Sequence, residues 1–365
     1  MSKARELAAL GNAYSDGALS NRNLIINGAM QVAQRGTSAS ASSAGYATVD
    51  RWRHAIANAG VFTVSQDTTG PDGFSNSFKY ECTTADAALA ASDYIRLEHR
   101  IEAQNLQQLS YGSSGAKQAT LSFWVKANKT GTYVCWFYQD DDVRMCNATY
   151  TINSSGTWEY KTITVPADAV GVIDNDNGLG LIVGWILAAG TDYTSGSAPT
   201  SWQSDVTADR YVGQSVNLAD TIGNYWQITG VQLEVGDTAT PFEHRSYGQE
   251  LALAQRFFQK IGGTENNLII GHSHTYSGGY SYGVFKYDAP MRAIPSGSVS
   301  TNAAGTWRYR YGSGLNVDNI ATQVGIDQFG ISQCRFFMGH GQAANTQGWI
   351  RGQSSASYVV LDAEL

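Results

Sequence analysis

The chain has 365 residues, which is enough for two or three hydrophobic cores. Its net charge is −7, and charged residues make up only 15% of it, against roughly 25% in ordinary soluble domains. The basic residues do not cluster into a stripe, which argues against nucleic-acid binding. The sequence has no apolar run of about 18 residues, and its N-terminus lacks the apolar segment of a secretory signal, so we expect a soluble protein without membrane insertion.

The composition favours a mainly β protein. Glycine (39 residues), tyrosine (20) and tryptophan (9) are abundant, and few charges with many Gly, Ser, Thr and aromatic residues are typical of short strands joined by tight turns. We expect a jelly-roll-like β-sandwich, a connecting α-helix, a smaller C-terminal β domain and a short N-terminal helix.

The N-terminal segment, residues 1–20, is predicted to be an anchoring helix and linker. A helix over residues 4–10 ends at Gly11, and at about two turns it is marginal alone in water. Leu7 and Leu10 are therefore expected to anchor the chain by packing against symmetry mates or a neighbouring protein. A frayed terminus is the alternative.

The first β domain is predicted over residues 21–245. Residues 121–126 and 133–138 alternate with a period of two, as half-buried strands do. Residues 178–187 are apolar at nearly every position, so both faces of that strand should be covered. Three aromatic side chains could line a sugar-binding face here, although an inner-sheet role is favoured; they are Trp124, Trp136 and Tyr138.

The last strand of this domain changes parity. Trp226 and Ile228 share one parity, whereas Val231 and Leu233 take the other. One inserted residue produces such a change, and Gly230 is of the type that tolerates the insertion, so the pattern predicts a β-bulge.

A connecting helix is predicted over residues 246–263. Ser246 can cap it, with Gln249 three positions on. Apolar residues recur at helical spacing until Gly262 and Gly263 end the helix; they are Leu251, Leu253, Ala254, Phe257, Phe258 and Ile261.

The second β domain is predicted over residues 264–365 and is assigned a receptor-binding role. Strands are expected around residues 280–288, 306–311, 334–338 and 357–363. In the second of these, Trp307, Tyr309 and Tyr311 lie on one side, and Arg308 and Arg310 on the other. A domain this small buries a modest share of its surface, which favours a homotrimer.

Candidate catalytic and metal sites are few. The run Asp140–Asp142 is expected at a hairpin turn. Asp174–Gly178 lacks the spacing of an EF-hand, which leaves a structural calcium as the alternative to a turn. His272 and His274 could point the same way, but no third ligand is near them in the sequence. We expect no catalytic residues, no cofactor and no metal site.

The four cysteines show no metal-binding spacing. Cys82, Cys135, Cys146 and Cys334 are expected to be small buried hydrophobic residues. A Cys135–Cys146 disulfide across a hairpin is the alternative, which a reducing cytosol disfavours.

Adhesion through aromatic and small polar residues is the remaining chemistry. Tyr276, Tyr280 and Tyr282 lie among Gly and Ser in the segment 272–282, a composition typical of adaptable binding loops. Arg308 and Arg310 could contact acidic polysaccharide or phosphate. The alternative is a Gly-rich hairpin whose tyrosines pack at a trimer interface.

Several strings in the chain resemble tail-associated structural proteins of tailed bacteriophages. VQLEVG, ATPFEHRS and ELALAQRFFQK (231–260) resemble the segment that closes a carbohydrate-binding-module-like β-sandwich in those proteins. Other strings resemble the opening, the middle strands and the distal domain; they are NRNLIINGAMQVAQRGTS (21–38), YATVDRW (46–52), LSFWVKA (121–127), TWEYKTITVP (157–166), YDAPMRAIPS (287–296) and LDAEL (361–365).

The resemblance implies a virion fibre or tail protein, assembled in the host cytoplasm and in contact with the host. We therefore expect self-association, other virion tail or capsid proteins and host cell-surface polysaccharide as partners. Two alternatives stay open: an architectural decoration of capsid or tail without receptor contact, and a glycan depolymerase.

Overall fold

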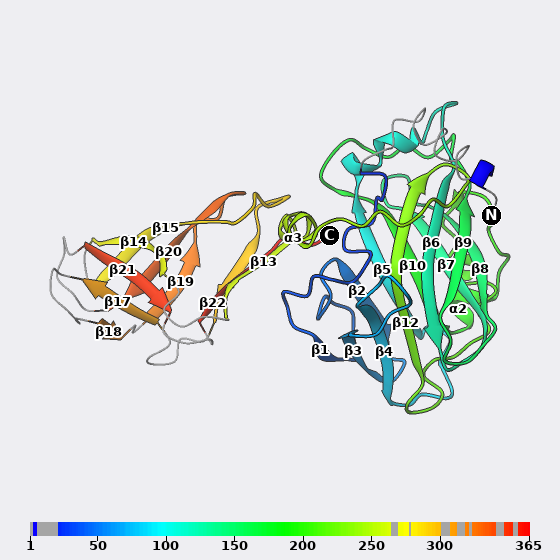
Figure 1. Ribbon diagram of the computed structural model, residues 1–365, viewed down its shortest axis with the longest axis horizontal. Coiled ribbons are helices and arrows are strands. Elements are labelled where there is room, and N and C mark those ends of the chain that lie inside the picture. The colour runs from blue at the N-terminus through cyan, green and yellow to red at the C-terminus, as the bar shows by residue number, and fades with distance from the viewer. Residues whose placement is uncertain are drawn as a thin grey trace. The chain divides into compact units, whose positions relative to one another are not determined.

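A computed structural model describes residues 3–5, 21–263, 269–276, 279–300, 307–311, 318–320, 323–340, 347–352 and 357–365 (Figure 1). The chain is mainly β and divides into two compact units, Met1–Glu250 with Leu365, and Leu251–Glu364. Within the N-terminal segment, residues 3–5 are helical and exposed. Leu7 and Leu10, the predicted anchoring residues, lie outside the described residues.

The first unit is a sandwich of two six-stranded antiparallel sheets. The first sheet has the order β1-β3-β4-β12-β6-β9, and the second has the order β11-β8-β7-β10-β5-β2. Their strands are β1 Ser38–Ala41, β2 Trp52–Ala57, β3 Val61–Asp67, β4 Ser77–Thr84, β5 Tyr94–Glu102, β6 Ala119–Ala127, β7 Gly131–Gln139, β8 Arg144–Ile152, β9 Glu159–Val165, β10 Leu179–Ala189, β11 Gln203–Ser204 and β12 Tyr225–Val235. The short helices are η1 Ala103–Leu109, α2 Thr191–Thr194 and η2 Thr207–Asp209.

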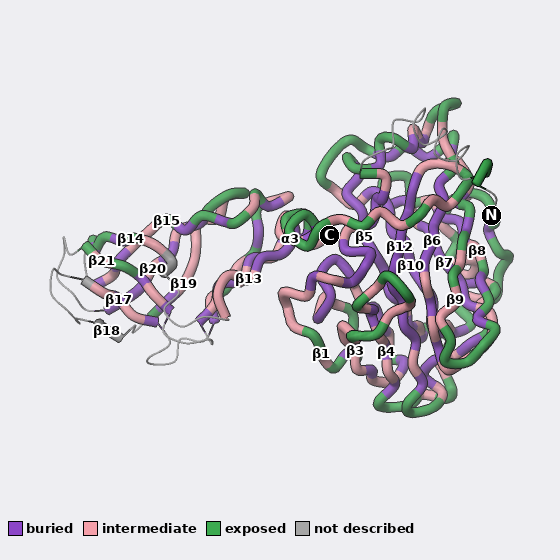
Figure 2. Tube along the Cα trace, viewed as in Figure 1, coloured by how far each residue is buried: buried purple, intermediate pink, exposed green. Residues whose placement is uncertain are grey.

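The core of this unit lies between the two sheets. Phe123 of β6 and Phe137 of β7 are buried in it, as the alternating pattern predicts. β10 is buried along both faces (Figure 2): Val183 belongs to the central core, and Ile182 belongs to a second cluster on the outer face of the second sheet. The sandwich with a buried apolar strand is thus as predicted.

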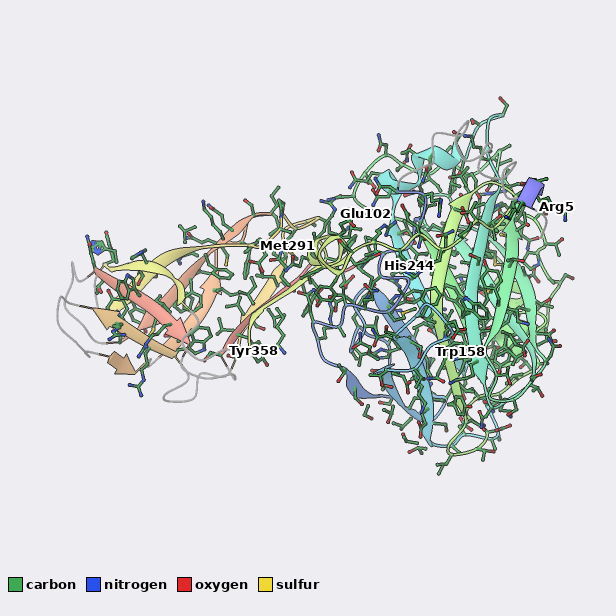
Figure 3. All side chains as sticks on the ribbon, in the orientation of Figure 1. Arg5, Glu102, Trp158, His244, Met291 and Tyr358 are labelled. Carbon is green, nitrogen blue, oxygen red and sulfur yellow. The ribbon has the colours of Figure 1, made fainter. Side chains whose placement is uncertain are left out.

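The bulge at Gly230 is confirmed. The register of β12 against β6 shifts between Thr229 and Gln232, and Gly230 has a φ of +60°, where a residue without Cβ is favoured. The ring of Phe74 lies over this glycine. Phe74 in turn packs against Phe242 and His244, the latter labelled in Figure 3. The bulge and its aromatic cover therefore form one local unit.

Helix α3 runs over Tyr247–Gln255 and has the predicted cap. The Ser246 backbone N–H donates to Gln249 Oε1 at 3.0 Å, and the Gln249 N–H donates to Ser246 Oγ at 3.4 Å. The predicted end at residue 263 is wrong, because Phe258–Gly262 form strand β13 instead. Phe and Ile fit a strand as well as a helix, and pairing with the C-terminal strand decides between them.

The second unit contains a three-stranded sheet, β13-β22-β16, and a seven-stranded sheet, β18-β17-β21-β14-β15-β20-β19. Both are antiparallel. The strands that follow β13 are β14 Ile269–Thr275, β15 Tyr280–Lys286, β16 Ser296–Val299, β17 Trp307–Tyr311, β18 Asp318–Ile320, β19 Gln323–Asp327, β20 Gln333–Gly339, β21 Gln347–Gly352 and β22 Tyr358–Asp362. The four strands expected from the sequence are present within two residues at each end.

One core lies between these two sheets. Trp307 and Phe336 of the larger sheet are buried, with their ring centroids 5.4 Å apart, and Val359 and Leu361 of β22 belong to the same cluster. The inner face of the seven-stranded sheet is therefore covered by the core. Its other face is not part of this core and is available for contact with a ligand.

The four cysteines are buried and free. They act as small apolar residues, as expected from the sequence. No helix among the described residues is long and apolar enough to cross a membrane.

Candidate functional site

The outer face of the seven-stranded sheet gathers four of the five residues predicted to contact a glycan, together with His272 and His274. Trp307, Tyr309 and Ile350 are buried on the inner face, and because side chains alternate along a strand, their neighbours lie on the outer one. Cross-strand partners share a face. The described side chains placed there by register form the aromatic–basic face: His272, His274, Tyr280, Tyr282, Val284, Lys286, Arg308, Arg310, Gln323, Asp327, Gln333, Arg335, Phe337, Gln347, Trp349 and Arg351.

One half of the aromatic–basic face consists of β15, β20 and β19. Tyr282 lies opposite Phe337, which lies opposite Gly325, and the Phe337 ring occupies the space that a Cβ on Gly325 would need, 2.4 Å away. Arg335 lies over the Tyr282 ring at 4.8 Å and pairs with Asp327, its Nε donating to Oδ1 at 2.7 Å. These contacts hold two aromatic rings side by side on a half-exposed surface.

Two tyrosines border this half. The Tyr280 hydroxyl donates to Gln323 Oε1 at 2.8 Å, which fixes the tyrosine across the sheet from the edge strand β19. Tyr276 follows the end of β14, and its backbone N–H donates to the Tyr280 carbonyl at 3.1 Å. Its side chain is 77% exposed. An exposed tyrosine therefore lies at the hairpin end of the face.

Trp349 connects the two halves of the face. It is the ladder partner of both His272 and Arg310. Its indole N–H donates to His272 Nδ1 at 2.7 Å, and the two rings meet edge to face with centroids 5.8 Å apart. The tryptophan remains 44% exposed. A large aromatic surface that is oriented by a hydrogen bond and open to solvent suits contact with a ligand.

The other half is rich in arginine. Arg308 and Arg351 are direct ladder partners, and Arg310 follows two residues after Arg308 on the same face. All three side chains are half-buried. Arg310 also has Asp318 opposite it in the ladder with β18.

A buried polar group supports the face from beneath. The Tyr309 ring stacks on His340 with centroids 3.9 Å apart, and His340 Nε2 shares a hydrogen bond of 2.7 Å with Ser281 Oγ. Ser281 also hydrogen-bonds Thr275, at 2.8 Å. Burial lowers the pKa of His340 to about 4, so this imidazole is neutral at physiological pH. The network joins β17, β15 and β14 to His340, the residue that follows β20, on the inner side of the sheet.

The five predicted contact residues come together, although their role in binding stays a prediction. Tyr280, Tyr282, Arg308 and Arg310 share the aromatic–basic face, and Tyr276 lies at its hairpin end. The expectation of a binding loop over residues 272–282 is wrong, because most of this segment forms β14 and β15. His272 and His274 do point the same way, onto this face.

The sequence prediction missed Trp349, Arg351, Arg335 and Phe337. They are recognised only through the register of β20 and β21 against distant strands. The alternation within each strand was the available signal, but it does not show which strands are neighbours.

Of the three aromatic residues proposed in the first unit, Trp136 and Tyr138 lie together on the outer face of the second sheet, with ring centroids 5.2 Å apart, and Trp124 lies apart from them. Trp124 lies on the outer face of the first sheet, with its ring 5.2 Å from that of Tyr160, whereas Trp136 lies on the outer face of the second sheet, opposite Gly184. The favoured inner-sheet role is therefore wrong for all three. Trp136 is only 3% exposed.

The segment around η2 covers the outer face of the second sheet. Tyr211 is fully buried beside Trp136, with ring centroids 5.8 Å apart, and its hydroxyl accepts a hydrogen bond from Arg96. Arg96 also lies over the Trp136 ring at 5.1 Å. The aromatic and basic groups here contact one another, so this face offers a ligand less than the aromatic–basic face does.

Two acidic segments lie side by side at one end of the first unit. Asp141 Oδ2 accepts the Asp174 N–H at 3.0 Å, and Asp142 Oδ2 accepts the Val172 N–H at 2.8 Å. Burial, together with the nearby carboxylates, raises the pKa of Asp141. Within the described ranges, no group of three or more His, Cys, Asp or Glu residues is arranged to hold a metal ion.

The sequence matches no family model and no curated protein. Among solved structures, the chain is similar to the enzymatically active domain of tailspike protein 4 from bacteriophage CBA120, with 12% identity over 59% of this chain and 22% of that one, and a TM-score of 0.32. It is also similar to a family 11 carbohydrate-binding module from Clostridium thermocellum in complex with a mixed-linked β-1,3-1,4 tetrasaccharide. That match has 10% identity over 62% of this chain and 100% of the module, with a TM-score of 0.26.

A third similar structure is TmCBM61 in complex with β-1,4-galactotriose. The identity is 11% over 59% of this chain and 100% of that one, and the TM-score is 0.25. The chain spans about a fifth of the tailspike domain, 22%.

Proposed function

We propose that this protein is a bacteriophage virion structural protein, a tail fibre or receptor-binding protein that adheres to host-surface glycans without catalysis. The observation that carries the proposal is the aromatic–basic face of the second unit. Tyr282, Phe337 and Trp349 present ring surface that stacks on the CH-rich faces of sugars, and the polar groups between them offer hydrogen bonds to hydroxyls.

Adhesion needs no deep cavity, which agrees with an open sheet face. Asp327 is a carboxylate of this face, and it is paired with Arg335 through both oxygens. Glycoside hydrolysis uses two carboxyl groups, one of which is held protonated. The proposal is binding rather than cleavage, and the release of reducing ends from bound polysaccharide would contradict it.

The virion role is supported by the sequence strings that resemble phage tail proteins, and by a charge-poor composition rich in aromatic residues. It includes assembly into a homotrimer in the host cytoplasm through the N-terminal segment, contact with other tail or capsid proteins, and a receptor-binding second unit. Light scattering of the purified full chain measures the trimer directly, and a monomeric mass would contradict that part.

Binding to bacterial envelope polysaccharide tests the adhesive part. In the full-length chain, we expect Tyr282→Ala combined with Trp349→Ala to weaken retention on immobilised host envelope polysaccharide by about tenfold or more, because truncating central aromatic contacts removes most of the binding energy. Tyr160→Ala is the matched control, since Tyr160 is an aromatic residue of the first unit with 44% exposure. Equal loss in both variants, or no retention of the wild type, would overturn the proposal.

A further inference from the structure

The charge of the aromatic–basic face is opposite to that of the whole chain. The chain has a net charge of −7. The residues that the register places on this face include five basic ones, Lys286, Arg308, Arg310, Arg335 and Arg351, and two acidic ones, Asp318 and Asp327, which gives 5 − 2 = +3. The excess of positive charge is therefore local to one sheet.

The positive groups are concentrated in one half of the face. Arg335 is bound to Asp327 and lies over Tyr282, so it belongs structurally to the aromatic half. Arg308 and Arg351 lie directly opposite one another in the ladder between β17 and β21. Because cross-strand partners share a face, this pairing brings two guanidinium groups together on the aromatic–basic face.

Trp349 lies where the two halves meet. It is next to Arg351 on β21 and is the ladder partner of Arg310, and its exposed ring is oriented by His272. A sugar ring stacked on Trp349 would bring its substituents within reach of the arginine half. Guanidinium groups bind planar anions such as carboxylates through two parallel hydrogen bonds, which adds geometric specificity.

We infer that the aromatic–basic face selects an anionic polysaccharide, one whose sugar rings carry carboxylate groups. The rings stack on Trp349 and Tyr282, and the carboxylates bind Arg308 and Arg351. The inference rests on the proposed function, since it names the class of glycan that the same face takes.

A matched pair of ligands isolates the charge. Polygalacturonate and its fully methyl-esterified form have the same sugar backbone, but the ester has lost the carboxylate charge. We expect the full-length protein to be retained on the acidic polymer about tenfold more strongly than on the ester, because charge-assisted hydrogen bonds are the strong ones. The preference should shrink as NaCl rises above about 0.1 M, where the screening length falls to about 10 Å.

Substitution of the arginine pair tests whether Arg308 and Arg351 cause the preference for the acidic polymer. Arg308→Gln combined with Arg351→Gln should abolish the preference, so that retention on the acidic polymer falls to the level that the same variant shows on the ester. Lys79→Gln combined with Lys126→Gln removes the same charge from the first sheet of the first unit, where both residues are half-buried, and should keep the preference. Circular dichroism and the melting temperature establish that each variant is folded; if the pair does not fold, Arg351→Gln alone should halve the preference or more.

The outcomes separate the two proposals. Equal retention of the two polymers by the wild type, no retention of the acidic polymer, or an equal loss in the lysine control overturns the anionic selectivity. Envelope binding that depends on Tyr282 and Trp349 can survive each of these results, and its failure alone overturns the proposed function.

Discussion

Glu98 illustrates how single residues determine the stability of the first unit. Its side chain is fully buried on the outer face of the second sheet and pairs with Arg53, Arg96 and Arg100. Burial by itself would raise the pKa of this carboxyl, but the three guanidinium groups hold it below its ordinary value of 4.5. The carboxylate therefore compensates several positive charges that are largely removed from water.

We expect Glu98→Gln to destabilise the first unit by about 3 kcal/mol at pH 7, because removing one partner of a buried ion pair leaves uncompensated charge. Urea unfolding measures the loss. Glu81→Gln is the control: Glu81 pairs with Lys79 but is 44% exposed, and its loss should cost less than about 1 kcal/mol.

The pH dependence of this effect has a definite sign. A carboxyl with a lowered folded-state pKa contributes stability above its unfolded pKa and loses it as the pH falls through the folded value. The difference between wild type and Glu98→Gln should therefore be full above about pH 5 and shrink below 4.5. A difference that grows on acidification would contradict this account.

At the scale of elements, the bulge in β12 is a feature that can be predicted from the sequence of one strand alone. The parity change around Gly230 is visible in the sequence because it concerns neighbours in one strand, and the register shift confirms it. The end of α3 could not be predicted from the local sequence. Residues 256–261 fit both a helix and a strand, and strand β13 forms because β22, about a hundred residues away, pairs with it.

For the same reason, only part of the aromatic–basic face could be predicted from the sequence. The alternation in β17 placed Arg308 and Arg310 on one side, but Trp349 and His272 are separated by 77 residues and meet only through the sheet. Local periodicity gives the face of each strand, whereas neighbouring strands are chosen by long-range packing. The tyrosines and two arginines were predictable for this reason, and their partners were not.

Substitution of Gly230 tests the bulge. We expect Gly230→Ala to destabilise the first unit by about 2 kcal/mol or more, since a left-handed backbone costs an L residue roughly 1–2 kcal/mol and the new Cβ would lie 2.7 Å from the Phe74 ring. Gly248→Ala in α3 is the control, because apart from its chain neighbours and the backbone of its own helix no described atom lies within 4 Å of its Cβ position. It should be neutral or stabilising by about 0.5 to 1 kcal/mol. Equal effects of both substitutions, in thermal unfolding, would contradict a strained bulge.

At the scale of the whole molecule, the two units have separate cores. The central cluster of the first lies between its two six-stranded sheets, and the cluster of the second includes Phe336 and Leu361. Substitutions far apart that share no partners have additive, independent effects. A chain with two such cores should unfold in two steps rather than one.

Calorimetry of the full chain should therefore show two transitions that respond to different substitutions. Glu98→Gln should lower the midpoint temperature of the transition that belongs to the first unit. Phe336→Ala should lower the midpoint temperature of the other, because the cavity that it opens in the second core reduces the free energy of unfolding by about 3 to 5 kcal/mol. The double variant should show the sum of the two effects. A single transition that both substitutions lower equally would mean that the units unfold as one, and the aromatic–basic face could then not be altered without disturbing the sandwich of the first unit.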